Sequence, residues 1–159
     1  MSEIVWRDRA KIELLRTVKG YSEHQLDDKQ RQMQTDVLVA LVALFEIKHR
    51  VTVQVRLHNE SLFFRSEIMD DGTLVTHYLG EEFGATYYYQ QTAFPYQAYC
   101  INFNQIWESS HKYHITFDNK LSEEKFVEFL NSLGGPHNLD ELRKLKEQRF
   151  ERYRAMFAA

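Results

Sequence analysis

The chain is poor in the residues that interrupt or cross-link a fold. Its 159 residues include two prolines, six glycines and one cysteine, Cys100. A lone cysteine in an apolar run cannot form an intramolecular disulfide, so we expect a reducing compartment and a cytoplasmic protein. No linker or low-complexity tract divides the chain, and a chain of this length can fold as one domain (residues 1–159) without a metal or a disulfide.

Long hydrophobic runs are also missing. The longest, Val37–Phe45, has nine residues, about half of the ~20 that a membrane-spanning helix needs. The first fifteen residues carry charges every few positions, where a secretory signal would have an apolar centre. The sequence therefore predicts neither membrane insertion nor secretion.

Catalytic and cofactor motifs are absent from the sequence. There is no Gly-x-Ser-x-Gly turn and no glycine-rich phosphate loop, and consecutive acids such as those at positions 70 and 71 are usually solvated turn residues. His111 and His114 are three residues apart, so on a strand they would face opposite sides and would converge on a metal ion only if His111 lies in the turn, and no Cys or acid is placed to complete four ligands. We expect no cofactor, no metal and no catalytic residue.

One pair of residues keeps an enzymatic alternative open. His114 and Thr116 are two residues apart on a predicted strand, so both face the same side and could hold a phosphate together. Two-histidine phosphoesterases use such a pair twice, but neither His58 nor His77 is followed by the matching Thr or Ser. A small phosphoesterase or hydrolase that uses His114 and Thr116 is therefore an alternative and not the main prediction.

What the sequence does contain is a strong asymmetry of charge and aromatic residues. The net charge is only −3, yet residues 57–110 hold seven acidic residues against one basic residue, Arg65, and twelve of the 22 aromatic residues. The segments on either side carry slightly more basic than acidic residues. An acidic, tyrosine-rich window between more basic ends favours a surface that contacts another macromolecule.

Helical patterns occupy both ends of the chain. Apolar residues at helical spacing predict helices over residues 5–19 and 25–49, and over residues 122–133 and 138–157 after the acidic window. Val37–Phe45 is apolar on every side, so we expect it to be covered all round by the sheet, by other helices or by a second subunit. This excess of apolar surface favours a homodimer.

The region between the helices, residues 51–117, reads as strands. Alternation of apolar and polar residues predicts about six short strands, and Asp70-Asp71-Gly72 is a strong hairpin signal. The expected strands start near 51, 61, 73, 85, 98 and 112, with 98–103 as the fifth and 112–117 as the last. Short connections imply antiparallel neighbours, so the predicted fold class is α+β: one antiparallel sheet of five to six strands with two N-terminal and two C-terminal helices.

These observations favour a non-enzymatic protein-binding or adaptor protein. Because successive strand residues alternate between faces, the run Tyr87-Tyr88-Tyr89 must direct at least one tyrosine away from the helix-packed side. Tyrosine is enriched at interface centres, and charges at the rim of an interface steer the encounter with the partner. The predicted partner-binding residues are Tyr88, Phe94, Tyr96, Glu81 and Glu82.

Nucleic-acid binding through the basic residues of the first and last helices is a further alternative. The last helix carries six basic residues, but its four acids in the same span reduce its net charge to +2. Interleaved charges of both signs are typical of a solvated amphipathic helix, so a nucleic-acid partner is not expected. The partner we predict is another protein.

Overall fold

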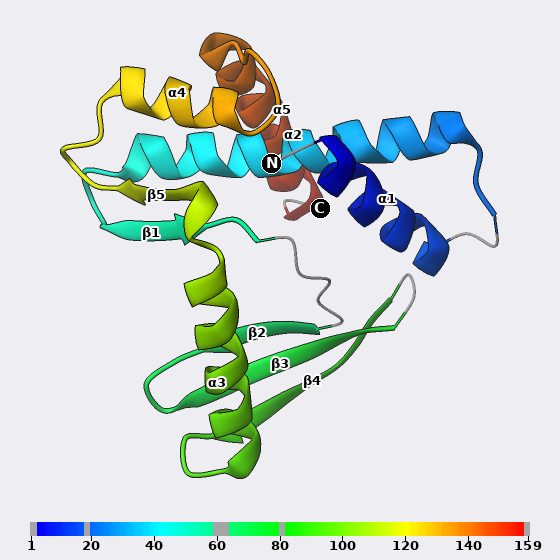
Figure 1. Ribbon diagram of the computed structural model, residues 1–159, viewed down its shortest axis with the longest axis vertical. Coiled ribbons are helices and arrows are strands. Elements are labelled where there is room, and N and C mark those ends of the chain that lie inside the picture. The colour runs from blue at the N-terminus through cyan, green and yellow to red at the C-terminus, as the bar shows by residue number, and fades with distance from the viewer. Residues whose placement is uncertain (1–2, 18–19, 59–63, 80–81, 158–159) are drawn as a thin grey trace.

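The computed structural model describes residues 3–17, 20–58, 64–79 and 82–157. The chain combines helices with antiparallel strands, so the predicted α+β class is confirmed. Figure 1 shows two lobes, which we name by their content. The helical lobe holds both chain ends and the sheet lobe hangs below it.

The helical lobe contains five helices and two strands. They are α1 (Glu3–Thr17), α2 (Glu23–Ile47), β1 (Val53–Arg56), the short 3-10 helix η1 (His111–Tyr113), β5 (His114–Phe117), α4 (Glu123–Ser132) and α5 (Leu139–Phe157). In Figure 1, α2 runs through the middle of this lobe, with α4 above it and the two strands below. The four helices predicted at the chain ends are present, with bounds close to those expected.

Helix α2 is held at its start by a capping box. The side chain of Ser22 accepts a hydrogen bond from the backbone N–H of Gln25, and the side chain of Gln25 accepts one from the backbone N–H of Ser22. This satisfies N–H groups that the first turn cannot pair internally. With no Gly or Pro inside it, the helix continues for 25 residues to Ile47, as the sequence predicts.

The core of the helical lobe lies between α2, α4, α5 and the two-stranded sheet. Phe126 is fully buried, stacks on Phe45 with ring centroids 4.4 Å apart, and meets Phe117 edge-on at 5.8 Å. The buried cluster is Leu38, Leu41, Val42, Phe45, Ile115, Phe117, Leu121, Phe126, Leu130, Leu133, Leu139 and Leu142. Residues from α2, β5, α4 and α5 therefore share one apolar interior.

The apolar segment Val37–Phe45 is not covered on every side, contrary to our expectation. Leu38, Val39, Leu41, Val42 and Phe45 are buried, but Ala40 is exposed. The side of α2 that carries Ala40 faces an open groove beside α5. Alanine on that side is small enough that its exposure adds little apolar surface.

The sheet lobe is a three-stranded antiparallel sheet with one helix. Its elements are β2 (Phe64–Ile68), β3 (Gly72–Leu79), β4 (Glu82–Gln90) and α3 (Phe94–Ser109), and the strand order is β2-β3-β4. Thr73 pairs with Ile68 on one side and with Tyr89 on the other. Helix α3 runs across this sheet and back to the helical lobe (Figure 1).

The prediction of a single sheet with five to six strands is wrong. The described strands form one sheet of two strands and one of three, because residues 98–103 belong to helix α3 and not to a strand. With this helix inserted, β5 cannot continue the meander and pairs with β1 instead. The helix plan is also different, since a third helix lies inside the region predicted as strands.

Two sequence signals for α3 were available. Pro95 occupies the first turn of the helix, where its missing N–H leaves no hydrogen bond unmade and its fixed φ suits the helix. Apolar side chains recur at 96, 99, 100, 103, 106 and 107, which is helical spacing. The alternation of residues 99, 101 and 103 imitates a strand only over this short stretch.

Candidate protein-contact surface

The acidic, aromatic window of the sequence corresponds to the sheet lobe and the segments that join it to the helical lobe. The interior of this lobe is small: among its described side chains, Thr73 and Val75 are fully buried. Helix α3 has no buried residue along its whole length. The lobe is therefore a thin layer whose aromatic side chains are largely at the surface.

Large apolar side chains are exposed on this lobe. Phe94 is 80% exposed, Ile101 58%, Tyr87 49%, Tyr88 48% and Phe103 47%. Phe94 and Ile101 are seven residues apart on α3, which places them on one side of the helix, two turns apart. Exposed apolar area of this kind marks an interaction surface when it is contiguous.

The three consecutive tyrosines alternate between the two faces of the sheet, as predicted. Tyr87 and Tyr89 lie on the side that α3 covers, where the rings of Tyr89 and Tyr99 have centroids 6.0 Å apart. Tyr88 lies on the opposite face, across from Leu74. A Cβ on Gly72 would come within 2.6 Å of the Tyr88 ring, so this ring lies directly over a glycine.

Two tyrosines hold the turn that carries Asp70 and Asp71. The hydroxyl of Tyr88 donates to the backbone oxygen of Asp71 at 3.1 Å, and the hydroxyl of Tyr96 donates to the backbone oxygen of Met69 at 3.3 Å. The first fixes the turn to β4 and the second fixes it to α3. We call this end of the lobe, residues 69–72 with Tyr88, Phe94 and Tyr96, the acidic turn.

The ionisation of both tyrosines reflects these neighbours. Desolvation and the negative charge of Asp71 raise the pKa of Tyr88 above its ordinary value. A hydrogen bond with Cys100, with desolvation, the Cys100 thiol and the two aspartates as smaller causes, raises the pKa of Tyr96. Each phenol therefore stays neutral and keeps its proton for hydrogen bonding at physiological pH.

The structure brings together three of the five predicted partner-binding residues. Tyr88, Phe94 and Tyr96 lie at the acidic turn, while Glu82 begins β4 at the far end of the strand, about 20 Å from Tyr88 at the usual rise per residue. Glu81 lies outside the described residues, and the side chain of Glu82 is not described. The acids beside the tyrosines are Asp70 and Asp71, whose sequence pattern predicts turn residues and no contact role.

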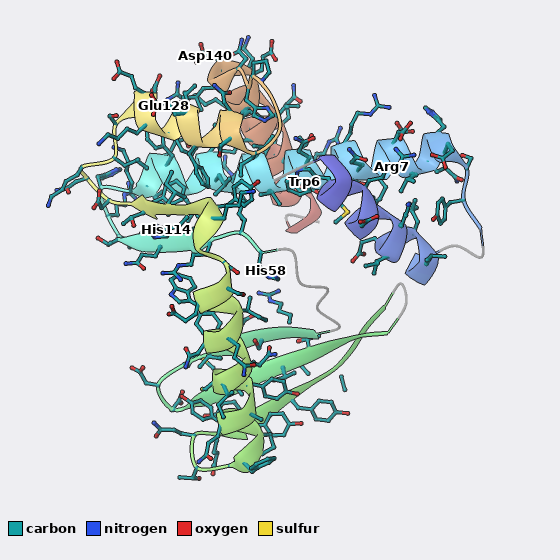
Figure 2. All side chains as sticks on the ribbon, in the orientation of Figure 1. Trp6, Arg7, His58, His114, Glu128 and Asp140 are labelled. Carbon is teal, nitrogen blue, oxygen red and sulfur yellow. The ribbon has the colours of Figure 1, made fainter. Side chains whose placement is uncertain are left out.

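The pair proposed for phosphate chemistry lies elsewhere, on the two-stranded sheet. Thr116 Oγ1 and His114 Nε2 are 3.4 Å apart and His114 is exposed. Figure 2 labels His114 and His58 near the junction of the two lobes. Among the residues that the structure describes, His114 hydrogen-bonds only with Thr116, so no described carboxylate orients its ring as a general base requires.

Metal binding finds no support in the described part of the chain. No group of three or more His, Cys, Asp or Glu side chains that could hold a metal ion occurs there. Within the same residues, no helix combines the length and apolar character needed to cross a bilayer.

Several basic residues of the terminal helices form ion pairs with acids. Arg7 pairs with Glu23 and, at 2.8 Å, with Asp27. On α5, Arg143 pairs with Glu123 and Asp140, Lys146 with Glu46 and Glu147, and Arg149 with Asp36. These pairs reduce the positive potential that a nucleic-acid backbone would meet.

Lys146 shows how far this pairing extends into the fold. Its side chain is only 8% exposed. Burial would lower the pKa of its ammonium group, but hydrogen bonds to Glu147 and Glu46 outweigh that effect and raise it. The same contact lowers the pKa of Glu147. Lys146 is thus a structural cation and not part of a basic surface.

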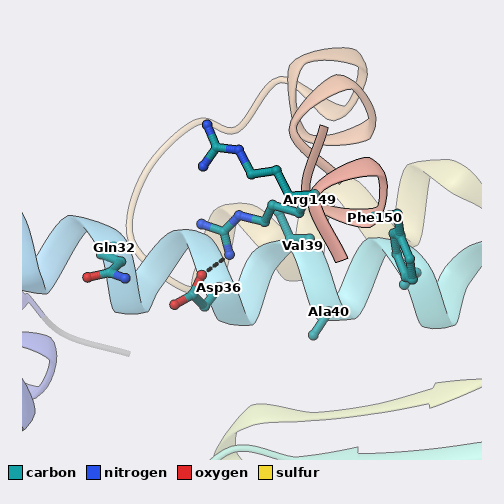
Figure 3. Close-up of a pocket in the computed structure, with 8 residues that line it drawn as sticks. Gln32, Asp36, Val39, Ala40, Arg149 and Phe150 are labelled. Atoms are coloured by element: carbon teal, nitrogen blue, oxygen red, sulfur yellow. Dashed lines mark ion pairs between the residues drawn. The ribbon is translucent and has the colours of Figure 1, made fainter. Parts of the chain in front are cut away.

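An open groove with a volume of about 660 Å³ lies between α2 and α5. Figure 3 shows residues that line it, with Val39 and Ala40 on α2, Phe150 on α5, and the ion pair between Asp36 and Arg149. The groove contains apolar and ionic groups of both signs. It offers a contact surface, but none of the predicted site residues line it.

Comparison of the chain with models of protein families, with curated proteins and with solved structures finds no significant match.

Proposed function

We propose that this chain is a non-enzymatic protein-binding or adaptor protein whose contact surface is the sheet lobe. The observation that supports this best is the exposure of large apolar side chains there. Of the eleven large apolar residues exposed in the described chain, six belong to this lobe: Met69, Tyr87, Tyr88, Phe94, Ile101 and Phe103. A lobe that keeps its aromatic residues outside is suited to bury them against another molecule.

The chemistry of the surface indicates what the partner carries. The window from 57 to 110 has seven acids, and its one basic residue, Arg65, is paired with Glu67 at 2.6 Å. The field of this lobe therefore attracts positive charge, and tyrosine rings bind both apolar groups and cations. The expected partner surface is basic, with apolar side chains that meet Phe94 and the tyrosines.

The test is affinity capture from the native host, with the double variant Phe94→Ala/Ile101→Ala beside the wild-type chain. Both side chains are exposed, so the variant should fold normally and lose its partner. The control is Ile47→Ala/Val51→Ala, which removes two exposed apolar side chains from the helical lobe, 42% and 47% exposed in the wild type. Retention of the same partner by both variants would contradict the proposal.

A homodimer is proposed as the state in which the chain works, with the α2–α5 groove as the face between copies. This face carries a small exposed apolar residue, Ala40, and a large one, Phe150, which is 44% exposed. In a two-fold contact, Phe150 of each copy can pack against Ala40 of the other. Sedimentation velocity tests the proposed homodimer: the wild-type chain should sediment as a dimer, and Ala40→Glu should sediment as a monomer. A wild-type chain that sediments as a monomer at all concentrations contradicts it.

A further inference from the structure

The outer edge of β4 is an open hydrogen-bonding edge. Among the described strands, in the order β2-β3-β4, β4 has one neighbour, β3. The backbone N–H of Gln91 donates to the backbone oxygen of Asp71 at 3.0 Å. Gln91 and Asp71 are therefore a hydrogen-bonded pair, and this pair sets which residues of β4 direct their backbone groups toward β3. Since the two kinds of pair alternate along an antiparallel ladder, Tyr89 and Tyr87 bond to β3, while Thr86 and Tyr88 direct their N–H and C=O groups outward.

This edge lacks several of the features that usually protect an edge strand, and the register shift of the β3–β4 ladder, between Thr76 and Tyr78, lies outside the segment Thr86–Tyr88. β4 is nine residues long and contains no Pro, Lys or Arg, the residues that commonly prevent another strand from pairing. The other edge of the sheet, β2, has five residues and carries the Arg65–Glu67 ion pair. The long edge is therefore the one open to a further strand.

Charge decides between the possible occupants. A second copy of this chain would place two identical acidic lobes side by side, each with seven acids and one basic residue between positions 57 and 110. Like charges at that distance oppose pairing. A basic segment gains from the same charges, and its lysine or arginine side chains can also lie over tyrosine rings.

We propose that the open edge of β4 binds an extended, lysine- or arginine-rich segment of another protein, which pairs with Thr86 and Tyr88 as a fourth strand of the sheet. This rests on the proposed protein-binding function and specifies its mode. Backbone hydrogen bonds give the segment its register. Its alternate side chains meet Tyr87 and Tyr89 on one face, and Thr86 and Tyr88 on the other.

The acidic turn favours a basic side chain at one end of the added strand. Asp70 and Asp71 are exposed and lie beside Tyr88, close to the point where β4 ends at Gln90. A basic side chain near that end of the added strand can reach these carboxylates, whereas the middle of the strand presents tyrosine and threonine. Recognition therefore combines a charged anchor at the turn with pairing along the edge.

The first experiment measures amide hydrogen exchange in the full chain. The probe is a capped nine-residue peptide in which lysine alternates with valine, and the control peptide has the same lysines but proline in place of each valine, so it cannot form a strand. Because the amides of Thr86 and Tyr88 point outward, they should exchange fast in the free protein and at least tenfold more slowly with the first peptide. The control peptide should leave them unchanged.

The second experiment uses matched variants at one position. Thr86→Pro removes an outward N–H but no backbone hydrogen bond to β3, and Thr86→Ala keeps that N–H. Both variants lose the contact between the hydroxyls of Thr86 and Thr76, so they differ in the N–H. Thr86→Pro should weaken peptide binding at least tenfold, and Thr86→Ala no more than twofold. If Thr86→Pro fails to fold, the exchange measurement on the unmodified chain still decides.

Each outcome separates this proposal from the general function. Protection of α3 amides instead of Thr86 and Tyr88 would overturn edge pairing while leaving a protein-binding lobe. Equal binding of both peptides, or equal binding of the first peptide by both Thr86 variants, would mean that peptide binding depends on net charge alone. That result would also overturn the proposal of strand pairing. Protection at β4 that rises with protein concentration without peptide would make a second copy the occupant, against our proposal.

Discussion

The two lobes of this chain treat their aromatic residues in opposite ways. In the helical lobe, Phe45, Phe117 and Phe126 meet in a core closed by three helices and a two-stranded sheet. In the sheet lobe, one helix covers part of one sheet face, and Phe94, Tyr87 and Tyr88 remain about half or more exposed. The difference shows that apolar content alone does not make a core, since burial depends on how many elements cover each face.

The sharpest way to break this comparison is the same substitution in both lobes. Phe126→Ala opens a cavity at a fully buried site and should lower the free energy of unfolding by about 3–5 kcal/mol. Phe94→Ala removes a side chain that is 80% exposed and should change stability by less than about 0.5 kcal/mol. Urea denaturation followed by circular dichroism measures both. Equal losses would mean that Phe94 is buried in solution.

A second test addresses the close contact of Gly72 with the ring of Tyr88. Gly72→Ala places a methyl carbon 2.6 Å from the ring of Tyr88. We therefore expect the free energy of unfolding to fall by about 1–3 kcal/mol. Tyr88→Ala removes the ring, and the double variant should recover most of that loss. Thermal unfolding of the four chains gives the coupling energy. Additive losses would contradict the contact.

A third test concerns the joint between the lobes. Arg56 Nη1 donates to the backbone oxygen of Trp107 at 2.5 Å, and its guanidinium lies 4.3 Å from the Trp107 ring centroid. Arg56→Leu removes both contacts at the end of α3, so we expect the free energy of unfolding to fall by about 1–2 kcal/mol.

The same variant tests our prediction that the chain is a single domain. If the lobes unfold together, wild type and Arg56→Leu should each show one transition, at different denaturant concentrations. The measurement is urea unfolding with hydrogen exchange read separately in α2 and in β3. Two separated transitions in the wild-type chain would contradict the single-domain prediction.

The smallest expected effect is a pH dependence in the helical lobe. Desolvation lowers the pKa of His137 below 6.5 in the folded chain, so the unfolded chain binds its proton more readily. The stability that this residue contributes is therefore complete above pH 6.5 and is lost as the pH falls through the folded pKa. His137→Gln should flatten the change of melting temperature between about pH 7 and 5. An unchanged slope would contradict the shift.

The sequence predicted the helical lobe better than the sheet lobe, for physical reasons. An unbroken run of helix formers predicts α2, and the hairpin signal at Asp70-Asp71-Gly72 predicts β2 and β3. Helix α3 was missed because its apolar residues lie on several sides, with Phe94 and Ile101 on one side and Phe103 on the opposite side, so they do not form one stripe. The partners of Tyr88 depend on register between strands, which local patterns do not fix.

The register of β1 and β5 has a consequence for the architecture of the chain. Arg56 faces His114, and the N–H of Leu57 donates to the oxygen of Tyr113 at 3.0 Å. The chain therefore leaves the helical lobe and returns to it at neighbouring points, about 5 Å apart in such a ladder. In this sense the sheet lobe is an insertion at the tip of a β-hairpin. Replacing residues 58–112 by an Asn-Gly turn would close that hairpin and leave every residue of the helical core in place.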